Sequence, residues 1–583
     1  MGDRQHPLTG RTLSQLPFRS AESGPGRTLV PTYRRSCTVR QTKGGTVNDG
    51  TSASAGILDV VVVGAGFAGM YALHRLRSDG LRVRVFEAGG GVGGVWYWNR
   101  YPGARCDVES VDYSYSFDPQ LEQDWDWSEK YATQPEILRY AEYVADRYDL
   151  RRDITFGTRV TDIVLDEAST RWTVHTDAGE RIDTQYVITA VGPLSNANVP
   201  AIPGLSDFVG PIYHTSQWPH DGVDFTGQRV GVIGTGSSGI QTVPKVAEQA
   251  THLSVFQRTP NFSVPAGNRP LTADDRRAQK QDYAERRRAS FASGGGSPHN
   301  AIPTPTLDVS PDERRAAFEK RWELGGVLFS KTFVDQLTDR AANDEARAFW
   351  EEKVRAVIDD PEVAALLIPT DHPIGAKRIC TDDHYFETFN RDNVSLINLR
   401  ATPITAIEPS GVRTGDTLHE LDALVLATGF DAMTGSLDKV NIVGRGGVTL
   451  QQAWQAGPRT YLGLGTHGFP NFFNLTGPGS PSVLANMVLH SELHVDWVAD
   501  AIAHIAAHDA VGIEATEEAV ESWVRELSER AAGTLMPAAN SWYLGANIPG
   551  RPRVFMPFVG GFGVYGQIIA DVADSGYKGF ELI

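Results

Sequence analysis

Two short glycine-rich stretches have the residue types and the spacing that bind the pyrophosphate of a dinucleotide. The first reads Gly64-Ala65-Gly66-Phe67-Ala68-Gly69, and the second reads Gly234-Thr235-Gly236-Ser237-Ser238-Gly239. Glycines at these positions allow a tight turn and let a pyrophosphate approach the start of a helix, whose free N–H groups and dipole favour an anion. The sequence therefore predicts two dinucleotide sites.

The residues that would meet the ribose differ between the two stretches. Glu87 follows the first stretch at the end of the strand pattern 81–86, where a carboxylate accepts hydrogen bonds from both ribose hydroxyls. The second stretch is followed by Arg258, with no carboxylate beside it. A guanidinium there makes a bidentate, charge-assisted pair with a 2′-phosphate, so we expect FAD at the first site and NADPH at the second. The alternative is that Arg258 is a surface residue without a partner.

The elements around each glycine stretch would place it at the end of a buried strand. Residues 58–63 form a β-branched run suited to a parallel strand, the helix after Gly69 stops at Gly80, and residues 81–86 form the next strand. The same order of strand, glycine turn, helix and strand repeats over residues 228–256. The sequence thus predicts an α/β fold with two Rossmann-like dinucleotide-binding domains.

The chain of 583 residues is too long for one core, so two or three domains are expected. It has no apolar run long enough to span a bilayer, and its net charge of -17 would repel nucleic acid, so we expect neither a membrane nor a nucleic-acid partner. Three cysteines, Cys37, Cys106 and Cys380, include no C-x-x-C pair, which argues against a disulfide framework, a metal site or a dithiol centre. We expect a cytoplasmic monomer.

Composition and pattern also divide the chain. Residues 1–55 are rich in Arg, Ser, Thr and Gly without an apolar core, so we expect a disordered tail rather than a signal peptide. Short alternating runs within 153–187 predict a small antiparallel excursion from the first sheet. A charged run at 274–288 and a helix pattern at 343–358 predict a helical insertion whose charges face solvent. The expected parts are an FAD-binding domain in 56–193 and 431–583, an NADP-binding domain in 194–265 and 376–430, and the insertion in 266–375.

A third pattern, Phe208-x-Gly210-x-x-x-His214-x-x-x-Trp218-Pro219, lies between the two glycine stretches. Taken alone, it fits ordinary linker packing equally well. With its flanks, it resembles the signature of type I Baeyer-Villiger monooxygenases, flavoenzymes that convert ketones into esters or lactones. The resemblance spans residues 57–583 and is strongest to the family branch that acts on steroids and phenylacetone. Disulfide reductases share the two-site layout, but the missing cysteine pair disfavours them.

The resemblance implies roles for residues that spacing alone leaves undecided. The aromatic run Trp96-Tyr97-Trp98 either covers a planar ligand or packs in a core, and the resemblance places it beside the flavin with Asp107. Arg378 matches the catalytic arginine, which Asp107 would position, and Lys377 matches a contact to the NADPH phosphate. Trp542 matches a residue on a loop that closes over NADP. The other cofactor-binding positions that the resemblance implies are Gly94, Val95, Tyr113 and Thr259.

The implied reaction consumes NADPH and O2. NADPH would reduce FAD, and an FAD C4a-peroxide would then insert one oxygen atom next to a ketone carbonyl, with Arg378 stabilising the anionic species. Small residues in 479–484 are expected to border the pocket, and a bulky ketone such as a 20-ketosteroid is the expected substrate. The alternatives are an aryl or open-chain ketone, flavin-dependent N- or S-oxygenation, and a flavoprotein without enzymatic activity.

Overall fold

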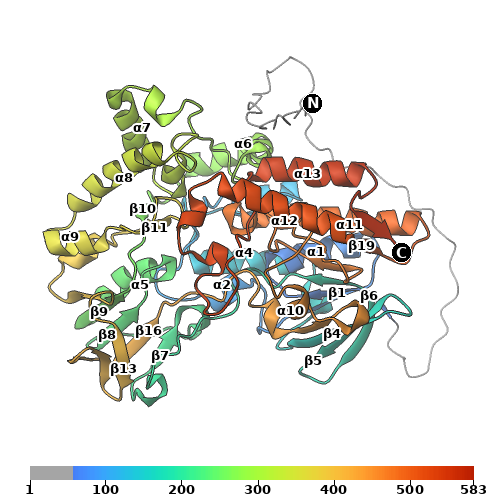
Figure 1. The fold of residues 1–583 in the computed structure, drawn as a ribbon, viewed down its shortest axis with the longest axis horizontal. Helices are drawn as coiled ribbons and strands as arrows, with labels where there is room; N and C mark the ends of the chain where they lie inside the picture. The colour runs from blue at the N-terminus through green and yellow to red at the C-terminus, as the bar shows by residue number, and fades with distance from the viewer. Residues whose placement is uncertain (1–56) are drawn as a thin grey trace, which may run out of the picture. The chain divides into compact units, whose positions relative to one another are not determined.

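The computed structural model describes residues 57–583, so the predicted tail lies outside the described residues. Figure 1 shows two separate groups of strands, one around β1, β4, β5 and β6 and the other around β7, β8, β9 and β16, each with its own helices. The predicted α/β class with two Rossmann-like domains and a helical insertion is confirmed.

The first sheet has the strand order β17-β4-β5-β6-β1-β2-β3, and β18 pairs with β6. Strand β1 is parallel to both of its neighbours, β6 and β2, and Val60, Val61 and Val62 on it are fully buried. The predicted antiparallel strands of 153–187 are observed for β4, β5 and β6, which pair antiparallel in that order. The prediction is wrong for β3, because β3 pairs in parallel with β2 and extends the main sheet. The strands are β1 (Leu58–Val63), β2 (Val83–Phe86), β3 (Ile154–Thr155), β4 (Val160–Asp166), β5 (Arg171–Thr176), β6 (Arg181–Thr189), β17 (Asn441–Val443) and β18 (Phe472–Asn474).

The second sheet is parallel throughout and has the order β12-β9-β8-β16-β7. Its strands are β7 (Ile212–His214), β8 (Arg229–Ile233), β9 (His252–Gln257), β12 (Val394–Asn398) and β16 (Ala423–Leu426). The last two come from beyond the insertion, so the sheet is completed only after the chain returns. A parallel sheet with helices on its faces is buried, which explains the continuous apolar runs in β8 and β16.

The insertion contains α6 (Ala273–Ala292), α7 (Pro311–Leu324), α8 (Arg340–Arg355) and α9 (Pro361–Leu367). Capping boxes start α6 at Thr272 and α7 at Ser310. A short parallel pair, β10 (Ser263–Pro265) with β11 (Cys380–Asp382), joins its two ends. The remaining elements are α1 (Phe67–Ser78), α2 (Val95–Trp98), α3 (Pro119–Asp124), α4 (Gln134–Arg147), α5 (Ser237–Ala247), β13 (Ile404–Glu408), β14 (Gly411–Thr414), β15 (Thr417–Glu420), α10 (Leu450–Ala453), α11 (Met487–Ala507), β19 (Ile513–Ala515), α12 (Glu517–Ala532), α13 (Phe562–Asp574) and β20 (Phe580–Leu582).

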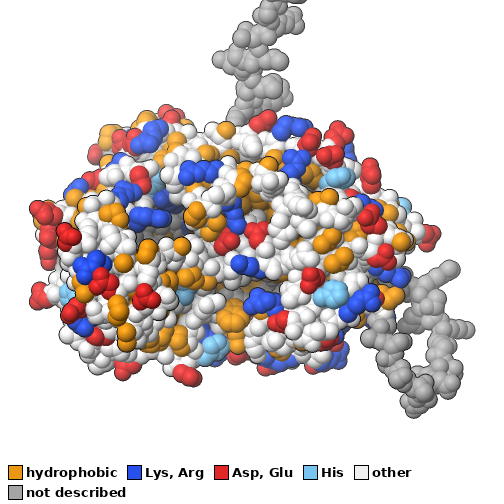
Figure 2. Space-filling view, turned by 60° about the horizontal axis from the view of Figure 1, so that its bottom comes forward, with side chains coloured by type: hydrophobic (Ala, Val, Ile, Leu, Met, Phe, Trp, Pro, Cys, Tyr) orange, Lys and Arg blue, Asp and Glu red, His pale blue; other side chains and the backbone are white. Residues whose placement is uncertain are grey.

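The surface carries both signs of charge. On the face drawn in Figure 2, acidic and basic side chains are interspersed and hydrophobic side chains are scattered between them. This face therefore presents no single-sign field that would attract a polyanion. Over residues 57–583, no helix is long and apolar enough to cross a membrane.

The carboxyl group of Asp382 in β11 predicts a pH-dependent stability. The residue is 8% exposed, its Oδ2 accepts a hydrogen bond of 2.5 Å from Ser263 Oγ, and no cation among residues 57–583 pairs with it. Burial raises the pKa of Asp382 from 3.8 to about 6. The folded chain therefore binds more protons than the unfolded chain between those values, so this group makes the free energy of unfolding fall as the pH rises through that range.

Asp382→Asn should remove this dependence, because an amide cannot ionise. We expect the advantage of the variant over the parent in the free energy of unfolding to grow by about 2 kcal/mol between pH 4.5 and pH 7.5. Urea unfolding at both pH values measures the difference. A stability change of equal size at both pH values would show that packing, and not the charge, determines the effect.

Candidate active site

The first glycine stretch forms the turn between β1 and α1. Gly64 has a φ of +103°, and a Cβ on Gly69 would lie 1.8 Å from the Gly64 carbonyl oxygen, so strand and helix are in direct backbone contact there. Glu87, at the end of β2, holds this turn: its Oε2 accepts from the Ala65 N–H at 2.7 Å and its Oε1 accepts from the Gly89 N–H at 2.6 Å. Each oxygen keeps a second lone pair for a further donor.

The helices that follow the two glycine stretches start without a side-chain cap. Gly66 and Gly236 are the N-cap residues of α1 and α5, and neither helix start has a capping side chain. The helices α6 to α12 all have one, whereas α2, α4 and α13 also lack it. The free N–H groups at these two starts need an acceptor, which a pyrophosphate supplies. The residues present at both starts therefore fit a dinucleotide.

The aromatic run beside the first turn is only partly buried, although Trp96 packs against the edge of the first core. It forms the one-turn helix α2, in which no residue is buried. Trp96 Nε1 donates to the Tyr113 hydroxyl at 3.0 Å, which joins two positions that the family resemblance assigned to cofactor binding. Because large aromatic surfaces are costly to leave in water, this arrangement favours a planar ligand over core packing.

The second glycine stretch lies next to a cluster of uncompensated positive charge. Arg258 directly follows β9 and forms no hydrogen bond or ion pair with any residue of 57–583. Burial lowers the pKa of Lys377, while Asp371 acts in the opposite direction and Arg400 and Arg258 lower it further, so these charges lie close together. Asp371 is already paired with Arg400. Arg258 and Lys377 are thus available for a phosphate.

Arg258→Ala should impair the use of NADPH and leave the use of NADH nearly unchanged. A lost charge-assisted contact to the 2′-phosphate is worth about 1.5 to 3 kcal/mol, which corresponds to roughly 10- to 150-fold in kcat/KM. Steady-state kinetics with both coenzymes measure this difference, and NADH serves as the internal control. Equal losses with the two coenzymes would assign Arg258 another role.

Arg378 and Asp107 form a bidentate ion pair between the two domains. Arg378 Nε donates to Asp107 Oδ2 and Nη2 donates to Oδ1, both at 2.8 Å, while Nη1 donates to the Val483 carbonyl at 2.5 Å. Burial by itself would lower the pKa of Arg378, but the pair with Asp107 outweighs it and raises that pKa above its usual value. The side chain is 31% exposed. Asp107 and Val483 leave two of its five N–H groups, one on each terminal nitrogen, and the Tyr543 hydroxyl lies beside the guanidinium as a further polar neighbour.

Two neighbours of Arg378 were missed by sequence reasoning. The Val483 carbonyl belongs to the backbone, so no residue type marks it, although residues 479–484 were expected near the pocket. Burial raises the pKa of Tyr543 to about 12, and the Arg378 guanidinium beside it acts in the opposite direction. Tyr543 is the next residue after Trp542, and the centroids of their rings lie 4.5 Å apart. Trp542, the predicted loop residue, is therefore connected through Tyr543 to the Arg378–Asp107 pair.

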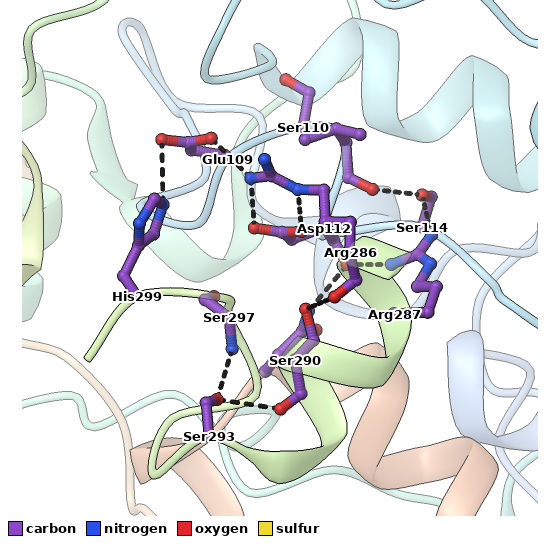
Figure 3. A network of polar contacts seen from close by, with 12 residues as sticks. Glu109, Ser110, Asp112, Ser114, Arg286, Arg287, Ser290, Ser293, Ser297 and His299 are labelled. Atoms are coloured by element: carbon purple, nitrogen blue, oxygen red, sulfur yellow. Dashed lines mark hydrogen bonds and ion pairs between the residues drawn. The ribbon is translucent and has the colours of Figure 1, made fainter. Parts of the chain in front are cut away.

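The segment that follows Asp107 is fixed by the insertion (Figure 3). Arg286 of α6 makes a bidentate pair with Asp112, at 2.6 and 2.8 Å, and a contact of 2.7 Å with Glu109. Arg287 is 6% exposed and donates to Glu122 and to the Asp112 carbonyl. The expectation that the charges of this run face solvent is therefore wrong for both arginines. Their partners lie 165 to 177 positions away in sequence, where helix periodicity cannot reveal them.

The signature residues lie on both sides of β7: Phe208 and Gly210 precede the strand, His214 is its last residue, and Trp218 and Pro219 follow the turn after it. His214 Nε2 lies 3.2 Å from Thr428 Oγ1 and 3.4 Å from the Asn198 carbonyl, and burial lowers the pKa of His214. A Cβ on Gly210 would lie 2.4 Å from the Asp422 carbonyl. Phe208 and Trp218 are buried in different clusters, and Pro219 follows them. Within residues 57–583, no hydrogen bond joins these residues to Arg378 or Asp107. His214, the last residue of β7, instead contacts Asn198 and Thr428.

Several proteins are similar to this chain over most of its length. The family described as pyridine nucleotide-disulphide oxidoreductase matches residues 61–270. An acetone monooxygenase (methyl acetate-forming) of Gordonia sp. is 42% identical, covering 90% of this chain and 99% of that protein. A Baeyer-Villiger monooxygenase of Pseudooceanicola batsensis is 43% identical, covering 89% and 95%. A phenazine N-monooxygenase of Lysobacter antibioticus is also 43% identical, covering 90% and 97%.

Solved structures agree with these relatives. An oxidized steroid monooxygenase bound to NADP has a TM-score of 0.88 and 68% identity, covering 91% of this chain and 100% of that one. A structure of OTEMO in complex with FAD and NADP has a TM-score of 0.88 and 40% identity, covering 90% and 99%. The predicted cofactors, FAD and NADPH, and the predicted oxidoreductase class are confirmed. The chain belongs to the type I Baeyer-Villiger monooxygenase family.

Proposed function

We propose that this monooxygenase acts on bulky ketones, with a 20-ketosteroid as the preferred class and the acetate ester of the corresponding alcohol as the product. The observation that carries the proposal is the 68% identity to a steroid monooxygenase over 91% of the chain. The segment 479–484, which we expect to border the pocket, includes the Val483 carbonyl that binds Arg378, so it lies next to the ion pair. One methylene changes preference in a pocket by only about 1 to 3 kcal/mol, so an aryl or open-chain ketone is the competing substrate.

In this proposal, Arg378 stabilises the negative charge of the reacting oxygen, and Asp107 orients Arg378. FAD held at the first glycine turn would supply the redox chemistry, in which NADPH provides the hydride, one oxygen atom of O2 enters the ketone and the other leaves as water. Arg378 would stabilise the negative charge that develops on oxygen through its fixed positive charge and an N–H group that Asp107 and Val483 do not use. Asp107 fixes the plane of the guanidinium through its two contacts. Trp542 and its loop would exclude water while the ketone reacts.

A competition between progesterone and phenylacetone under limiting enzyme tests the substrate. We expect progesterone to be consumed first and a product with one added oxygen atom to accumulate, detected by mass spectrometry. Consumption of phenylacetone with progesterone left untouched at equal concentration would overturn the steroid proposal and leave the monooxygenase assignment intact.

A second candidate function is N-oxygenation, which the 43% identity to a phenazine N-monooxygenase favours. Adding phenazine as a third substrate in the same competition separates the two reactions, because an N-oxide and an ester differ in fragmentation. A monomeric state and a cytoplasmic location stay predictions, which light scattering and cell fractionation measure.

A further inference from the structure

A loop of the flavin-binding part lies directly against the helix that starts at the second glycine stretch. The Tyr101 hydroxyl donates to Gln241 Oε1 at 2.9 Å, and Gln241 Nε2 donates to the Arg105 carbonyl at 3.1 Å. Both ends of one amide side chain are therefore used, one by a side chain and one by the backbone of the same loop. Gln241 belongs to α5, which starts at Ser237.

The backbone of the loop also contacts α5 without a side chain between them. Gly103 has a φ of +83°, and a Cβ on it would lie 2.3 Å from the Gln241 carbonyl oxygen and 3.2 Å from Lys245 Cγ. Any larger residue would push the loop away from the helix. The contact at Gly103 therefore fixes the distance between the loop and α5.

The position of this contact connects two parts of the site. Gln241 lies about one turn after the start of α5, whose free N–H groups fit the pyrophosphate of NADP. Arg105 lies two residues before Asp107, which holds Arg378 through both carboxylate oxygens. A displacement of α5 would thus be transmitted through one amide to the residue that orients the guanidinium.

The protonation of the phenol fixes the direction of the hydrogen bond. Burial raises the pKa of Tyr101 to about 12, and the Ser238 hydroxyl beside it acts in the opposite direction. The phenol is therefore neutral at pH 7 and donates to Gln241 Oε1, which leaves the amide N–H groups for the Arg105 carbonyl. Ser238 is part of the second glycine stretch, so Tyr101 also reaches the edge of the predicted pyrophosphate site.

We propose that Gln241 and Tyr101 are positioning residues that set the location of bound NADP relative to the Arg378–Asp107 pair. They form a bridge that keeps the coenzyme aligned with the flavin for hydride transfer and keeps Asp107 in place for oxygen transfer. The inference rests on the proposed assignment of the second glycine stretch to NADP.

The test compares Gln241→Ala, Tyr101→Phe and the double variant, all as FAD-loaded full chains. Losing one hydrogen bond corresponds to about 2- to 12-fold in an equilibrium constant, so we expect the dissociation constant of NADP+, measured by calorimetry, to rise about 3- to 10-fold in each single variant. The rate constant of anaerobic flavin reduction by NADPH and the yield of ester per NADPH should both fall. The double variant should resemble Gln241→Ala, because the two residues act through one hydrogen bond.

The controls separate positioning from folding. Glu248→Gln changes an exposed pair with Lys245 at the end of the same helix and should leave all three quantities unchanged. FAD content and melting temperature should stay at the parent values in every variant. If Gln241→Ala unfolds, Gln241→Glu replaces it, since it keeps the acceptor for Tyr101 and loses the donor to Arg105.

Two results would overturn the bridge: additive effects of the two substitutions, or parent-like NADP+ affinity, reduction rate and ester yield in both single variants. If instead the assignment of NADP to the second glycine stretch is wrong, the parent enzyme itself binds no NADP+ at that stretch. Gly236→Val distinguishes that case, since a side chain there enters open space at the start of α5 and should abolish NADP+ binding only if the assignment holds.

Discussion

Arg378→Ala is expected to leave hydride transfer from NADPH to FAD largely intact and to reduce ester formation by at least about 100- to 1,000-fold, the usual effect of removing a donor aimed at developing negative charge. Arg378 is held by three hydrogen bonds to Asp107 and Val483, and its side chain is still 31% exposed. Alanine removes the cation and leaves the Asp107 carboxylate without its partner, so the site becomes negative where it must bind an anion. Stopped-flow reduction and product analysis by mass spectrometry measure the two steps separately.

Two further variants give this prediction its controls. Arg378→Lys keeps the charge, but a lysine cannot make the bidentate pair with Asp107 and reach the Val483 carbonyl together, so it should recover only a small part of the ester yield. Asp107→Asn keeps the shape and loses the charge that orients the guanidinium. If Arg378→Ala forms ester at the parent yield, Arg378 does not stabilise the reacting oxygen and the prediction is wrong.

Gly69→Ala is expected to cost about 3 kcal/mol or more in the free energy of unfolding and to give protein that is purified without yellow colour. The added Cβ would lie 1.8 Å from the Gly64 carbonyl oxygen and 2.9 Å from its carbon, and both atoms belong to the backbone. The helix α1 must therefore move away from β1, which opens the turn that fits the pyrophosphate. Thermal unfolding and the flavin absorbance of the purified protein measure the two effects.

Gly66→Ala is the matched comparison in the same turn. Its Cβ would come no closer than 3.4 Å to Gly94 Cα, an ordinary contact, so the chain itself tolerates it. We expect Gly66→Ala to keep the melting temperature of the FAD-free protein and to bind FAD more weakly, because the Cβ occupies space that the ligand approaches. A yellow Gly69→Ala protein with an unchanged melting temperature would contradict the account of strand and helix contact.

The sequence by itself determined the two dinucleotide units. A glycine turn between a buried strand and a helix is a local pattern, since backbone sterics and apolar spacing act within a few residues. The same holds for the contrast between Glu87 and Arg258, because each follows the strand next to its glycine turn. These local rules placed β1, α1, β8 and α5 close to where they are observed. They failed for β3, whose parallel partner β2 lies far away in sequence.

Only the tertiary structure decided how these units are joined. Arg378 and Asp107 are 271 positions apart, and only the resemblance to a known family related them, because no spacing rule connects residues at that distance. The carbonyl of Val483 and the amide of Gln241 are generic groups whose importance depends on what lies opposite. Arg286 and Arg287 have the sequence pattern of an exposed helix face and are paired because the first domain covers them. Helix periodicity reports which face is charged, whereas long-range packing determines whether that face meets water or carboxylates.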